Sequence, residues 1–289
     1  MRGIILTARP DLEVNRRLVE AGRSLGVELE IVDGTRAVAR AGGSGASVEG
    51  AGEPGVVVPR IGNWRPASLL AVLEALESSG WWSPNPAAAV RVGRDHWRTV
   101  LHLARAGLPV PESVAGAEPE TLAAAGARLG FPVVVKQRRS RMGVGVVRCD
   151  DRAHLEAVLD SLWRLGDEVV VQAWVPSGGR SHRLLIAGGK VVAAAAFEAG
   201  PGEWRSNAAR GGRAAPLEPS AEERFLAQSA ADALGLGICG VDILPGPDGP
   251  VVVEVNPSPG FRHLEAATET DVAAALVEAL VSMAPPGRR

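Results

Sequence analysis

The stretch Gly240–Asn256 reads GVDILPGPDGPVVVEVN. Two apolar runs on either side of a loop rich in Pro and Gly predict an antiparallel hairpin. With the turn centred near Asp248, Asp242 and Glu254 are equidistant from the turn and lie opposite each other, where Cβ atoms are roughly 5 Å apart. Because side chains alternate along a strand, Asn256 shares a face with Glu254.

Two facing carboxylates on nearly apolar strands need a positive partner, because unpaired carboxylates are almost never buried. A hard divalent cation fits best, since Mg²⁺ commonly uses one or two carboxylates while substrate phosphates complete its shell. The alternative is a solvated edge hairpin that carries two unrelated acids. The spacing alone leaves both interpretations open.

Composition limits the class of protein. A chain of 289 residues allows one large domain or two to three small ones, and a net charge of −2 gives no support for a nucleic-acid partner. Cys149 and Cys239 lack metal-site spacing and are expected to be small core residues. The run Ile4–Leu6 is too short for a signal peptide, and no run approaches membrane-spanning length. We therefore expect a cytoplasmic protein without a membrane partner, and a homo-oligomer is left open.

Apolar periodicity predicts two regions in which strands and helices mix. In the first, strands at residues 2–8, 27–32 and 55–61 and helices at 11–25 and 66–79 indicate a βαβ layer; residues 41–55 are expected to be a flexible loop. Asp95 is expected to cap a helix that runs to residue 106. In the second, we expect strands at 132–136, 143–147 and 168–175, a hairpin of 183–186 with 190–197, a loop at 200–215, and helices at 154–165, 220–234 and 270–283.

Lys136 and Lys190 are the only lysines among 31 Lys and Arg residues. Lys136 ends an apolar strand and is followed across a polar loop by Gly143 and Gly145. Such a loop lets backbone N–H groups approach phosphates, and a nearby ammonium adds a point charge. The alternative is a strand-end lysine that points to solvent.

A second polar loop carries Arg205-Ser206-Asn207 and Arg210-Gly211-Gly212. Arginine forks beside small residues suit anion binding, although such a loop is also typical of a plain surface. The five histidines share no spacing with Cys or acids that would predict a zinc site. No G-x-S-x-G elbow supports a serine hydrolase.

Taken in order, these motifs resemble an ATP-grasp ligase of the RimK type. The motifs that carry the resemblance are Pro59-Arg60-Ile61-Gly62, Arg94-Asp95, Lys136 with Gly143-Val144-Gly145, Val171-Gln172, Arg205-Ser206-Asn207, Arg210-Gly211-Gly212, Gly240–Leu244 and Glu254–Gly260. The resemblance covers essentially the whole chain and implies an α/β (α+β) ATP-grasp fold. Its parts would be an N-terminal βαβ pre-ATP-grasp domain (1–90), a central lid subdomain (91–175) and a C-terminal subdomain with the metal site (176–289).

The resemblance also implies a set of site residues. Asp242, Glu254 and Asn256 would hold Mg²⁺, with Mn²⁺ as an alternative. The ATP-binding residues would be Lys136, Gly143, Gly145, Gln172, Ala173, Trp174, His182, Arg205, Ser206 and Asn207. The catalytic arginines would be Arg183, Arg205 and Arg210.

Several positions depart from the family pattern. Ala173 stands where the family has an acid, His96 replaces a lysine expected beside ATP, and Ser140 replaces a loop glycine. The segment 176–182 is one residue shorter than usual and lacks an Asp that contacts the nucleotide, and His182 falls near that place. The metal ligands and Lys136 are retained, so the departures concern ATP binding.

The implied reaction is ligation of a carboxylate to an amine through an acyl phosphate, with ATP as phosphate donor. Within the family the amine is often L-glutamate, added to a protein tail or a small metabolite. Residues 136–213 contain 13 Lys and Arg against 8 Asp and Glu, which predicts an anionic carboxylate-bearing acceptor or amine. The alternatives are a kinase on the same fold and a nucleotide-binding regulatory protein.

Overall fold

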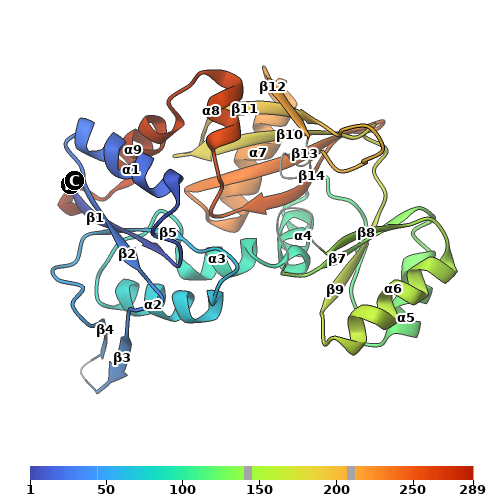
Figure 1. Cartoon of the computed structure of the whole chain (residues 1–289), viewed down its shortest axis with the longest axis horizontal. Helices are drawn as coiled ribbons and strands as arrows, with labels where there is room; N and C mark the ends of the chain where they lie inside the picture. The colour runs from blue at the N-terminus through green and yellow to red at the C-terminus, as the bar shows by residue number, and fades with distance from the viewer. Residues whose placement is uncertain (44, 140–144, 207–211, 289) are drawn as a thin grey trace.

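The computed structural model describes residues 1–43, 45–139, 145–206 and 212–288 (Figure 1). Sheets of three, four and five strands and one two-stranded hairpin organise this part of the chain. The mixture of parallel and antiparallel sheets with helices agrees with the expected α/β (α+β) class. Among the helices of these residues, none has the length and apolarity needed to cross a bilayer.

The N-terminal sheet has the strand order β2-β1-β5. Its strands β1 (Arg2–Thr7), β2 (Glu28–Asp33) and β5 (Val56–Arg60) are parallel. Parallel strands need a long crossover connection, which is helical between β1 and β2 and contains a hairpin between β2 and β5. The helix α1 (Glu13–Ser24) makes the first crossover, and α2 (Pro66–Ser78) follows β5. The predicted βαβ layer is therefore confirmed. The carboxyl end of β5 faces the C-terminal part of the chain, where Ile61 bonds to Ser258.

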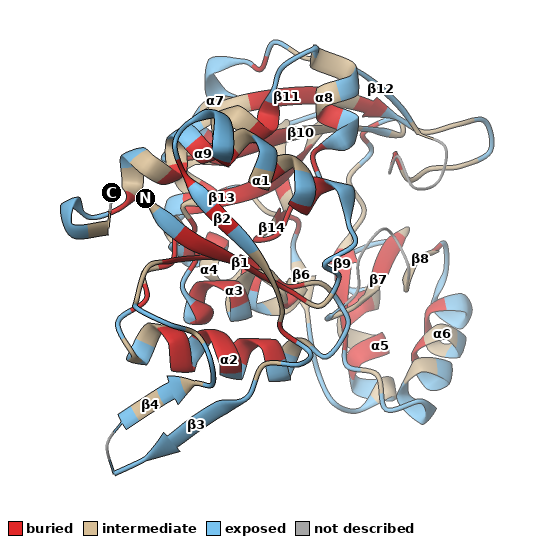
Figure 2. Cartoon of the chain, turned by 60° about the vertical axis from the view of Figure 1, so that its left-hand side comes forward, coloured by how far each residue is buried: buried red, intermediate tan, exposed pale blue. Residues whose placement is uncertain are grey.

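The expected flexible loop at 41–55 is partly wrong. The strands β3 (Ala39–Gly42) and β4 (Gly45–Val48) pair as a hairpin, and Figure 2 shows that they are largely exposed. Alanine and glycine give the segment little strand propensity, so its sequence is typical of a loop. Backbone pairing between Ala39 and Val48 nevertheless closes the hairpin.

Two helices connect the N-terminal sheet to the centre of the molecule, α3 (Ala87–Gly93) and α4 (His96–Arg105). As predicted, Asp95 caps α4: its Oδ1 accepts the backbone N–H of Arg98 at 3.1 Å. The short helix α3 was not predicted. Seven residues give too few turns for a periodic pattern.

The central subdomain is a four-stranded antiparallel sheet of order β6-β9-β7-β8 with the helices α5 and α6 (Figure 1). Its elements are β6 (Ser113–Val114), α5 (Pro119–Ala127), β7 (Val133–Gln137), β8 (Val146–Cys149), α6 (Arg152–Arg164) and β9 (Val169–Ala173). It has its own apolar core, which includes Leu122, Val135, Cys149 and Leu155. Cys149 is a buried free cysteine, as expected, and so is Cys239.

The C-terminal sheet has the order β12-β11-β10-β13-β14 and is antiparallel. Its strands are β10 (Arg180–Ala187), β11 (Lys190–Glu198), β12 (Arg213–Pro216), β13 (Ile238–Gly246) and β14 (Gly249–Asn256). The helices of this part are α7 (Ala221–Leu234), α8 (Arg262–Thr268) and α9 (Val272–Met283), followed by a 3₁₀ turn at Pro286–Arg288. The strand β12 corrects the expectation that 200–215 is entirely loop.

The N-terminal and C-terminal sheets share one apolar core. Ile5 and Val58 of the first sheet belong to the same buried cluster as Leu185 and Ala195 of the second and Leu276 of α9. The central subdomain is packed around a separate cluster. This arrangement places the carboxyl end of β5 beside the end of β14, and it leaves the central sheet to cover the β13–β14 hairpin from another side.

Candidate active site

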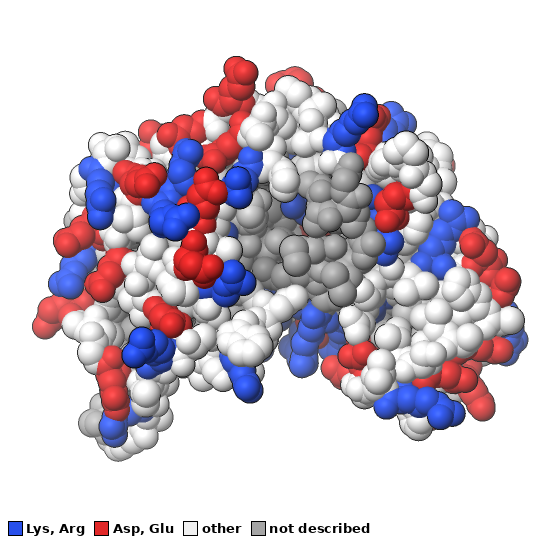
Figure 3. Space-filling model, in the orientation of Figure 1, with Lys and Arg blue, Asp and Glu red and all other residues white. Residues whose placement is uncertain are grey.

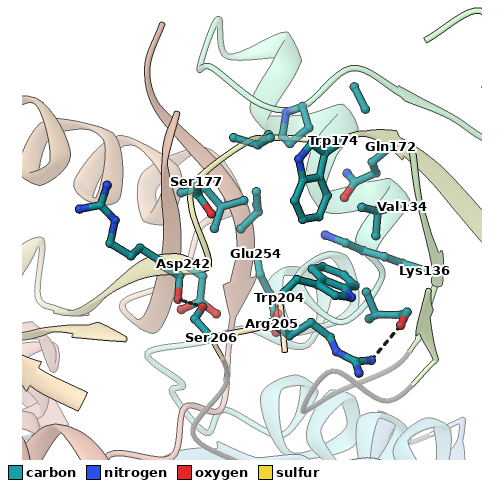
Figure 4. A pocket seen from close by; sticks show the side chains of 18 of the residues that line it. Val134, Lys136, Gln172, Trp174, Ser177, Trp204, Arg205, Ser206, Asp242 and Glu254 are labelled. Carbon is teal, nitrogen blue, oxygen red and sulfur yellow. Dashed lines mark hydrogen bonds between the residues drawn. The ribbon is translucent and has the colours of Figure 1, made fainter. Parts of the chain in front are cut away.

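A cavity of about 130 Å³ lies between the central sheet and the C-terminal sheet (Figure 4). The central subdomain and its approach contribute His96, Pro111, Val134, Lys136, Val146, Gln172 and Ala173, and the following segment contributes Trp174, Val175 and Ser177. The other wall consists of Arg180, Ser181, Asp242, Leu244, Val253 and Glu254, with Trp204, Arg205 and Ser206 from the loop after β11. Eight of the predicted site residues therefore line one cavity.

The two predicted carboxylates are brought together by the hairpin. Asp242 on β13 is the register partner of Glu254 on β14, and both line the cavity. Next to the turn, Ile243 pairs with Val252, and the register then shifts by one residue, which places Asp242 opposite Glu254 rather than Val253. Glu254 is half-buried and Asp242 is buried. This confirms the cross-strand geometry that the sequence predicted.

Arg183 gives Asp242 a positive partner from the neighbouring strand. The register of β10 and β13 pairs the two residues, and Arg183 Nε donates to Asp242 Oδ1 at 2.6 Å. A second bond joins Arg183 Nη2 to Asp242 Oδ2 at 2.5 Å. The Asp242 carboxylate raises the pKa of the Arg183 guanidinium further above its ordinary value. The pair is a bidentate fork, which is the strongest geometry for this ion pair.

Lys136 approaches the carboxylates from the opposite wall. It lies on β7, and Figure 4 shows its ammonium group pointing into the cavity. Burial lowers the pKa of Lys136, and the carboxylates of Glu254 and Asp242 oppose this shift. Within the described ranges, no carboxylate oxygen lies within 4.0 Å of the ammonium, although those two shift its pKa. The site thus holds a cation and two anions apart across a space that another group can fill.

The donor set fits a magnesium ion. Asp242 and Glu254 offer carboxylate oxygens on adjacent strands, and hard oxygens are the ligands that Mg²⁺ takes. The third predicted ligand, Asn256, ends β14, and its Oδ1 accepts the backbone N–H of Ser258 at 2.9 Å. An amide oxygen has two lone pairs, so this bond leaves one for a metal. His, Cys, Asp and Glu side chains of the described residues form no group of three or more that could hold a metal.

The other end of the cavity is apolar and aromatic. Trp174 and Trp204 pack edge to face with ring centroids 5.2 Å apart, and the guanidinium of Arg148 lies 4.7 Å from the centroid of Trp174. Gln172 is buried and donates from Nε2 to Ser113 Oγ at 2.9 Å. The backbone N–H of Ala173 donates to the carbonyl of Glu112, the residue before β6, at 2.8 Å. Aromatic faces beside fixed amides can hold a planar base.

The predicted arginine loop reaches the central subdomain through Arg205. Its Nη1 donates to the carbonyl of Val146 on β8 at 3.0 Å, and its Nε and Nη2 donate to Glu203 at 3.0 and 2.9 Å. The hydrogen bonds from Arg205 hold the pKa of Glu203 at about 2. Ser206 donates from Oγ to Ser181 Oγ at 2.6 Å. The described start of this loop therefore connects the C-terminal sheet to β8.

The structure does not bring His182 into the cavity. Its Nδ1 shares a short hydrogen bond with Oε1 of Glu223, a residue of the first turn of α7. Its neighbour Ser181 lines the cavity instead. Ser181 shares a face of β10 with Arg183, the residue that pairs with Asp242. His96, noted above as a replacement for a lysine, does line the cavity.

The remaining predicted residues divide into two groups. Gly145 has φ +68 and accepts the N–H of Gln137 at 3.0 Å through its carbonyl, and a Cβ there would lie 2.0 Å from Gln137 Oε1. The position therefore requires glycine, although Gly145 does not line the cavity. Gly143, Asn207 and Arg210 lie outside the described residues.

Comparison with known proteins gives consistent matches over the whole chain. A family profile described as the RimK PreATP-grasp domain matches residues 1–90, and one described as the RimK-like ATP-grasp domain matches residues 93–280. A protein of Pseudoalteromonas atlantica named probable alpha-L-glutamate ligase 2 is 36% identical, and the match covers 99% of this chain and 97% of that protein.

Two solved structures have the same fold. The RimK domain protein ATP-grasp of Sphaerobacter thermophilus is 26% identical with a TM-score of 0.74, over 96% of this chain and 99% of that one. The ATP-grasp ligase PsnB, solved with a precursor variant, Mg and ADP, is 23% identical with a TM-score of 0.74, over 96% of this chain and 97% of that one. The second likeness concerns the fold alone.

Proposed function

Because the chain belongs to the RimK-like ATP-grasp family and is thus an ATP-dependent carbon–nitrogen ligase, we propose that it joins L-glutamate to a carboxylate-bearing acceptor. The expected ATP-grasp fold with an N-terminal pre-ATP-grasp domain is confirmed. The family uses ATP and Mg²⁺. The choice of glutamate as the amine rests on the name of the 36% identical relative.

One observation carries the proposal: Lys136 faces Asp242 and Glu254 across a single cavity. Phosphoryl transfer needs positioning and charge neutralisation more than covalent chemistry from the protein. A lysine on one wall and a pair of metal-binding carboxylates on the other supply both. An ordinary structural ion pair would place these charges in contact, whereas Lys136 stays more than 4.0 Å from every carboxylate oxygen of the described chain.

We assign the metal to Asp242, Glu254 and Asn256, with Mg²⁺ as the natural ion and Mn²⁺ as a substitute. When bound, such an ion neutralises phosphate charge and orients the transferred group. Lys136 then binds phosphate oxygens from the other side. Arg183 holds the Asp242 carboxylate in place through its bidentate fork, which fixes one ligand before the nucleotide arrives.

The nucleotide would occupy the aromatic end of the cavity. Gln172, Ala173 and Trp174 would contact the base, while Arg205, Ser206 and Asn207 would contact the rest of the nucleotide. Gly143 and Gly145 belong to the loop that would approach the phosphates, and Arg183, Arg205 and Arg210 would neutralise the reacting groups. We leave His182 out of this set because its ring is engaged with Glu223 on α7.

The reaction has two steps. A carboxylate oxygen of the acceptor attacks the γ-phosphorus, the bond to the β–γ bridging oxygen breaks, and ADP leaves. The amine nitrogen then attacks the acyl carbon, inorganic phosphate leaves, and the nitrogen loses a proton. The acyl phosphate must be kept from water, and the central subdomain, which covers the cavity as a lid, would do this.

We propose that the acceptor or the amine is anionic. In the face of Figure 3, acidic and basic side chains are interspersed over both ends of the molecule. Three basic residues of the segment 136–213 line the cavity itself, Lys136, Arg180 and Arg205, and they support this proposal. The division into 1–90, 91–175 and 176–289, the cytoplasmic location and a homo-oligomer stay predictions.

The test is ADP release from ATP with and without amino acids and candidate acceptors, followed by mass spectrometry of the product. A ligase releases ADP only when both an amine and a carboxylate are supplied, and the product gains the mass of one residue per amide. A phosphorylated product formed without an amine would indicate a kinase. ATP binding without turnover across a broad substrate panel would overturn the proposal in favour of a regulatory protein.

A further inference from the structure

The loop Pro257–Pro259 follows the β13–β14 hairpin, which carries the proposed metal ligands and is called the metal hairpin below. This loop is held by residues from the N-terminal third of the chain. Asn85 donates from Nδ2 to the carbonyl of its first residue at 2.9 Å, and Arg60 donates from Nη1 to the carbonyl of its last at 2.6 Å. Between them, the backbone N–H of Ile61 donates to Ser258 Oγ at 3.1 Å. Each residue of the 257–259 loop is therefore bonded to a partner about 170 to 200 positions earlier.

Ser258 differs from its neighbours because it also reaches the metal hairpin. Its backbone N–H donates to Oδ1 of Asn256 at 2.9 Å, while its hydroxyl accepts from Ile61 and donates to the carbonyl of Pro59 at 3.4 Å. Two consecutive hydrogen bonds thus lead from the carboxyl end of β5 to a predicted metal ligand. Ser258 and Ile61 are both buried, so the bond between them is shielded from water, while Asn256 is half-buried.

The hydrogen bond from the Ser258 N–H to Asn256 decides which atom of the Asn256 carboxamide, oxygen or nitrogen, lies at this position. If the amide flipped, its NH₂ group would face the N–H of Ser258, and two donors would oppose each other. Only the oxygen of an amide binds a hard cation. The N–H of Ser258 therefore keeps the ligating atom in place, and its own position depends on the bond from Ile61 to the Ser258 hydroxyl.

The residues around the loop leave it little freedom. The prolines on either side of Ser258 have fixed φ angles. A Cβ at Gly93 would lie 3.2 Å from the ring of Pro257, and a Cβ at Gly240 would lie 3.1 Å from Pro259, so both prolines pack closely against neighbouring backbone. The position of Ser258 is therefore tied to the end of β5 on one side and to Asn256 on the other.

We propose that Ser258 is a positioning residue that connects the N-terminal sheet to the metal site by fixing the carboxamide of Asn256. The inference rests on the proposed metal role of Asn256. It gives the pre-ATP-grasp domain a part in metal binding, although none of residues 1–90 that the structure describes lines the cavity. Groups outside the ligand set that orient a ligand typically contribute 10- to 100-fold to metal affinity.

The experiment measures Mn²⁺ binding directly, by the loss of the free Mn²⁺ signal in electron paramagnetic resonance, with the full chain and saturating ADP. Ser258→Ala removes the hydroxyl but keeps the backbone N–H. We expect its Mn²⁺ dissociation constant to rise about tenfold. ADP binding in the presence of a chelator should stay at the wild-type value, because the cavity residues are unchanged.

Thr99→Val is the matched control. Thr99 is buried, and its Oγ1 donates to the carbonyl of Val92 at 3.1 Å; among the described residues its hydroxyl makes no hydrogen bond to the β13–β14 hairpin or to the 257–259 loop. The Thr99→Val variant loses one buried hydroxyl, as Ser258→Ala does, and should leave Mn²⁺ affinity unchanged. Should Ser258→Ala fail to fold, Ser258→Cys keeps the side-chain volume with a weaker acceptor and should show the same effect at smaller size.

Glu254→Gln separates this inference from the proposed function. If Glu254→Gln binds Mn²⁺ as the wild type does, the metal site itself is wrongly assigned. If Glu254→Gln loses Mn²⁺ while Ser258→Ala, or Ser258→Cys in its place, matches Thr99→Val, the metal site stands and the positioning role of Ser258 is overturned. If the Mn²⁺ dissociation constant rises in the Ser258 variants and in Glu254→Gln but not in Thr99→Val, the result supports both the metal site and the positioning role of Ser258.

Discussion

The two ends of the cavity are built differently. The carboxylate end lies on the β13–β14 hairpin, in a sheet that shares its apolar core with the N-terminal sheet. The lysine end lies on the central sheet, which has a core of its own. Polar links such as Arg138 to Asp95 and Arg205 to Val146 join that subdomain to the rest. One end is thus supported by two sheets, and the other depends on a few links.

The difference teaches where each kind of substitution should act. Changes at the carboxylate end should affect metal-dependent turnover without loosening the fold, because they leave the buried apolar side chains of the hairpin, such as Val241 and Val255, in place. Changes at the links of the central subdomain should lower the free energy of unfolding, or alter how this subdomain covers the cavity, before they affect metal binding. Five predictions test this division, from the largest expected effect to the smallest.

The largest effect is expected from Glu254→Gln. The substitution keeps the shape but removes the charge of one ligand, so Mg²⁺-dependent ADP release should fall by about 10²–10³-fold. The circular dichroism spectrum and thermal midpoint should stay near those of the wild type. Wild-type activity at low Mg²⁺ would show that Glu254 is not a ligand.

Lys136→Ala tests the opposite wall. Removing a charged hydrogen-bond donor to phosphate costs about 1.5–3 kcal/mol, which is about 10- to 100-fold in kcat/KM for ATP. Lys190→Ala is the control, since Lys190 begins β11 and is exposed. Lys136→Arg should not restore activity, because a planar fork does not replace a compact ammonium. Equal small losses for Lys136→Ala and Lys190→Ala would refute the assignment.

The carboxylate end was also the easier part to predict from the sequence. Asp242 and Glu254 are close along the chain, so one hairpin brings them near each other, although the exact pairing also needs the register shift between Asp242 and Ile243. Lys136 could be chosen because it is one of two lysines and ends an apolar strand. Their meeting across the cavity could not be derived from local patterns, since it depends on how two sheets pack; the family resemblance supplied it.

The misses have physical causes. Choosing Ser181 over His182 requires knowing which face of β10 meets the cavity. The segment 176–182 is one residue shorter than the family pattern, so an alignment to the family does not fix which of the two residues lies on that face. The β3–β4 hairpin and β12 are short strands with weak propensity, held by backbone pairing. The bond from Ile61 to Ser258 joins residues 197 positions apart, and no periodicity reveals such a pair.

Arg138→Met should weaken the link between the central subdomain and α4. Arg138 donates to both carboxylate oxygens of Asp95, at 3.1 and 2.6 Å, and the Asp95 side chain is only 4% exposed. We expect a loss of about 2 kcal/mol in the free energy of unfolding, measured by urea denaturation at pH 7. Arg139→Met should cost less than about 1 kcal/mol, because that side chain is 69% exposed.

The same pair predicts a pH dependence. Burial of Asp95 opposes ionisation, but the bonds from Arg138 and Arg98 prevail and hold its pKa below the ordinary 3.8. A carboxyl whose pKa is lowered on folding stabilises the protein above its unfolded pKa, and this is lost as pH falls through the folded pKa. The gap between wild type and Arg138→Met should therefore be constant from pH 5 to 8 and shrink below about pH 4. A gap that widens in acid would contradict this account.

The smallest effect concerns the charge of the substrate, and it tests whether the basic wall of the cavity serves more than ATP. Arg180 lines the cavity yet is exposed, so it can meet a second anion at the mouth. Because screening acts over roughly 10 Å at 0.1 M salt, KM for an anionic acceptor should rise a few-fold with added salt. Arg180→Gln should flatten that dependence while leaving KM for ATP nearly unchanged. Arg164→Gln, at the end of α6 on the lid surface, should keep the wild-type dependence. A KM that ignores salt, with glutamine accepted as well as glutamate, would show that Lys136 and Arg205 serve the nucleotide alone and that the second substrate is not recognised by charge.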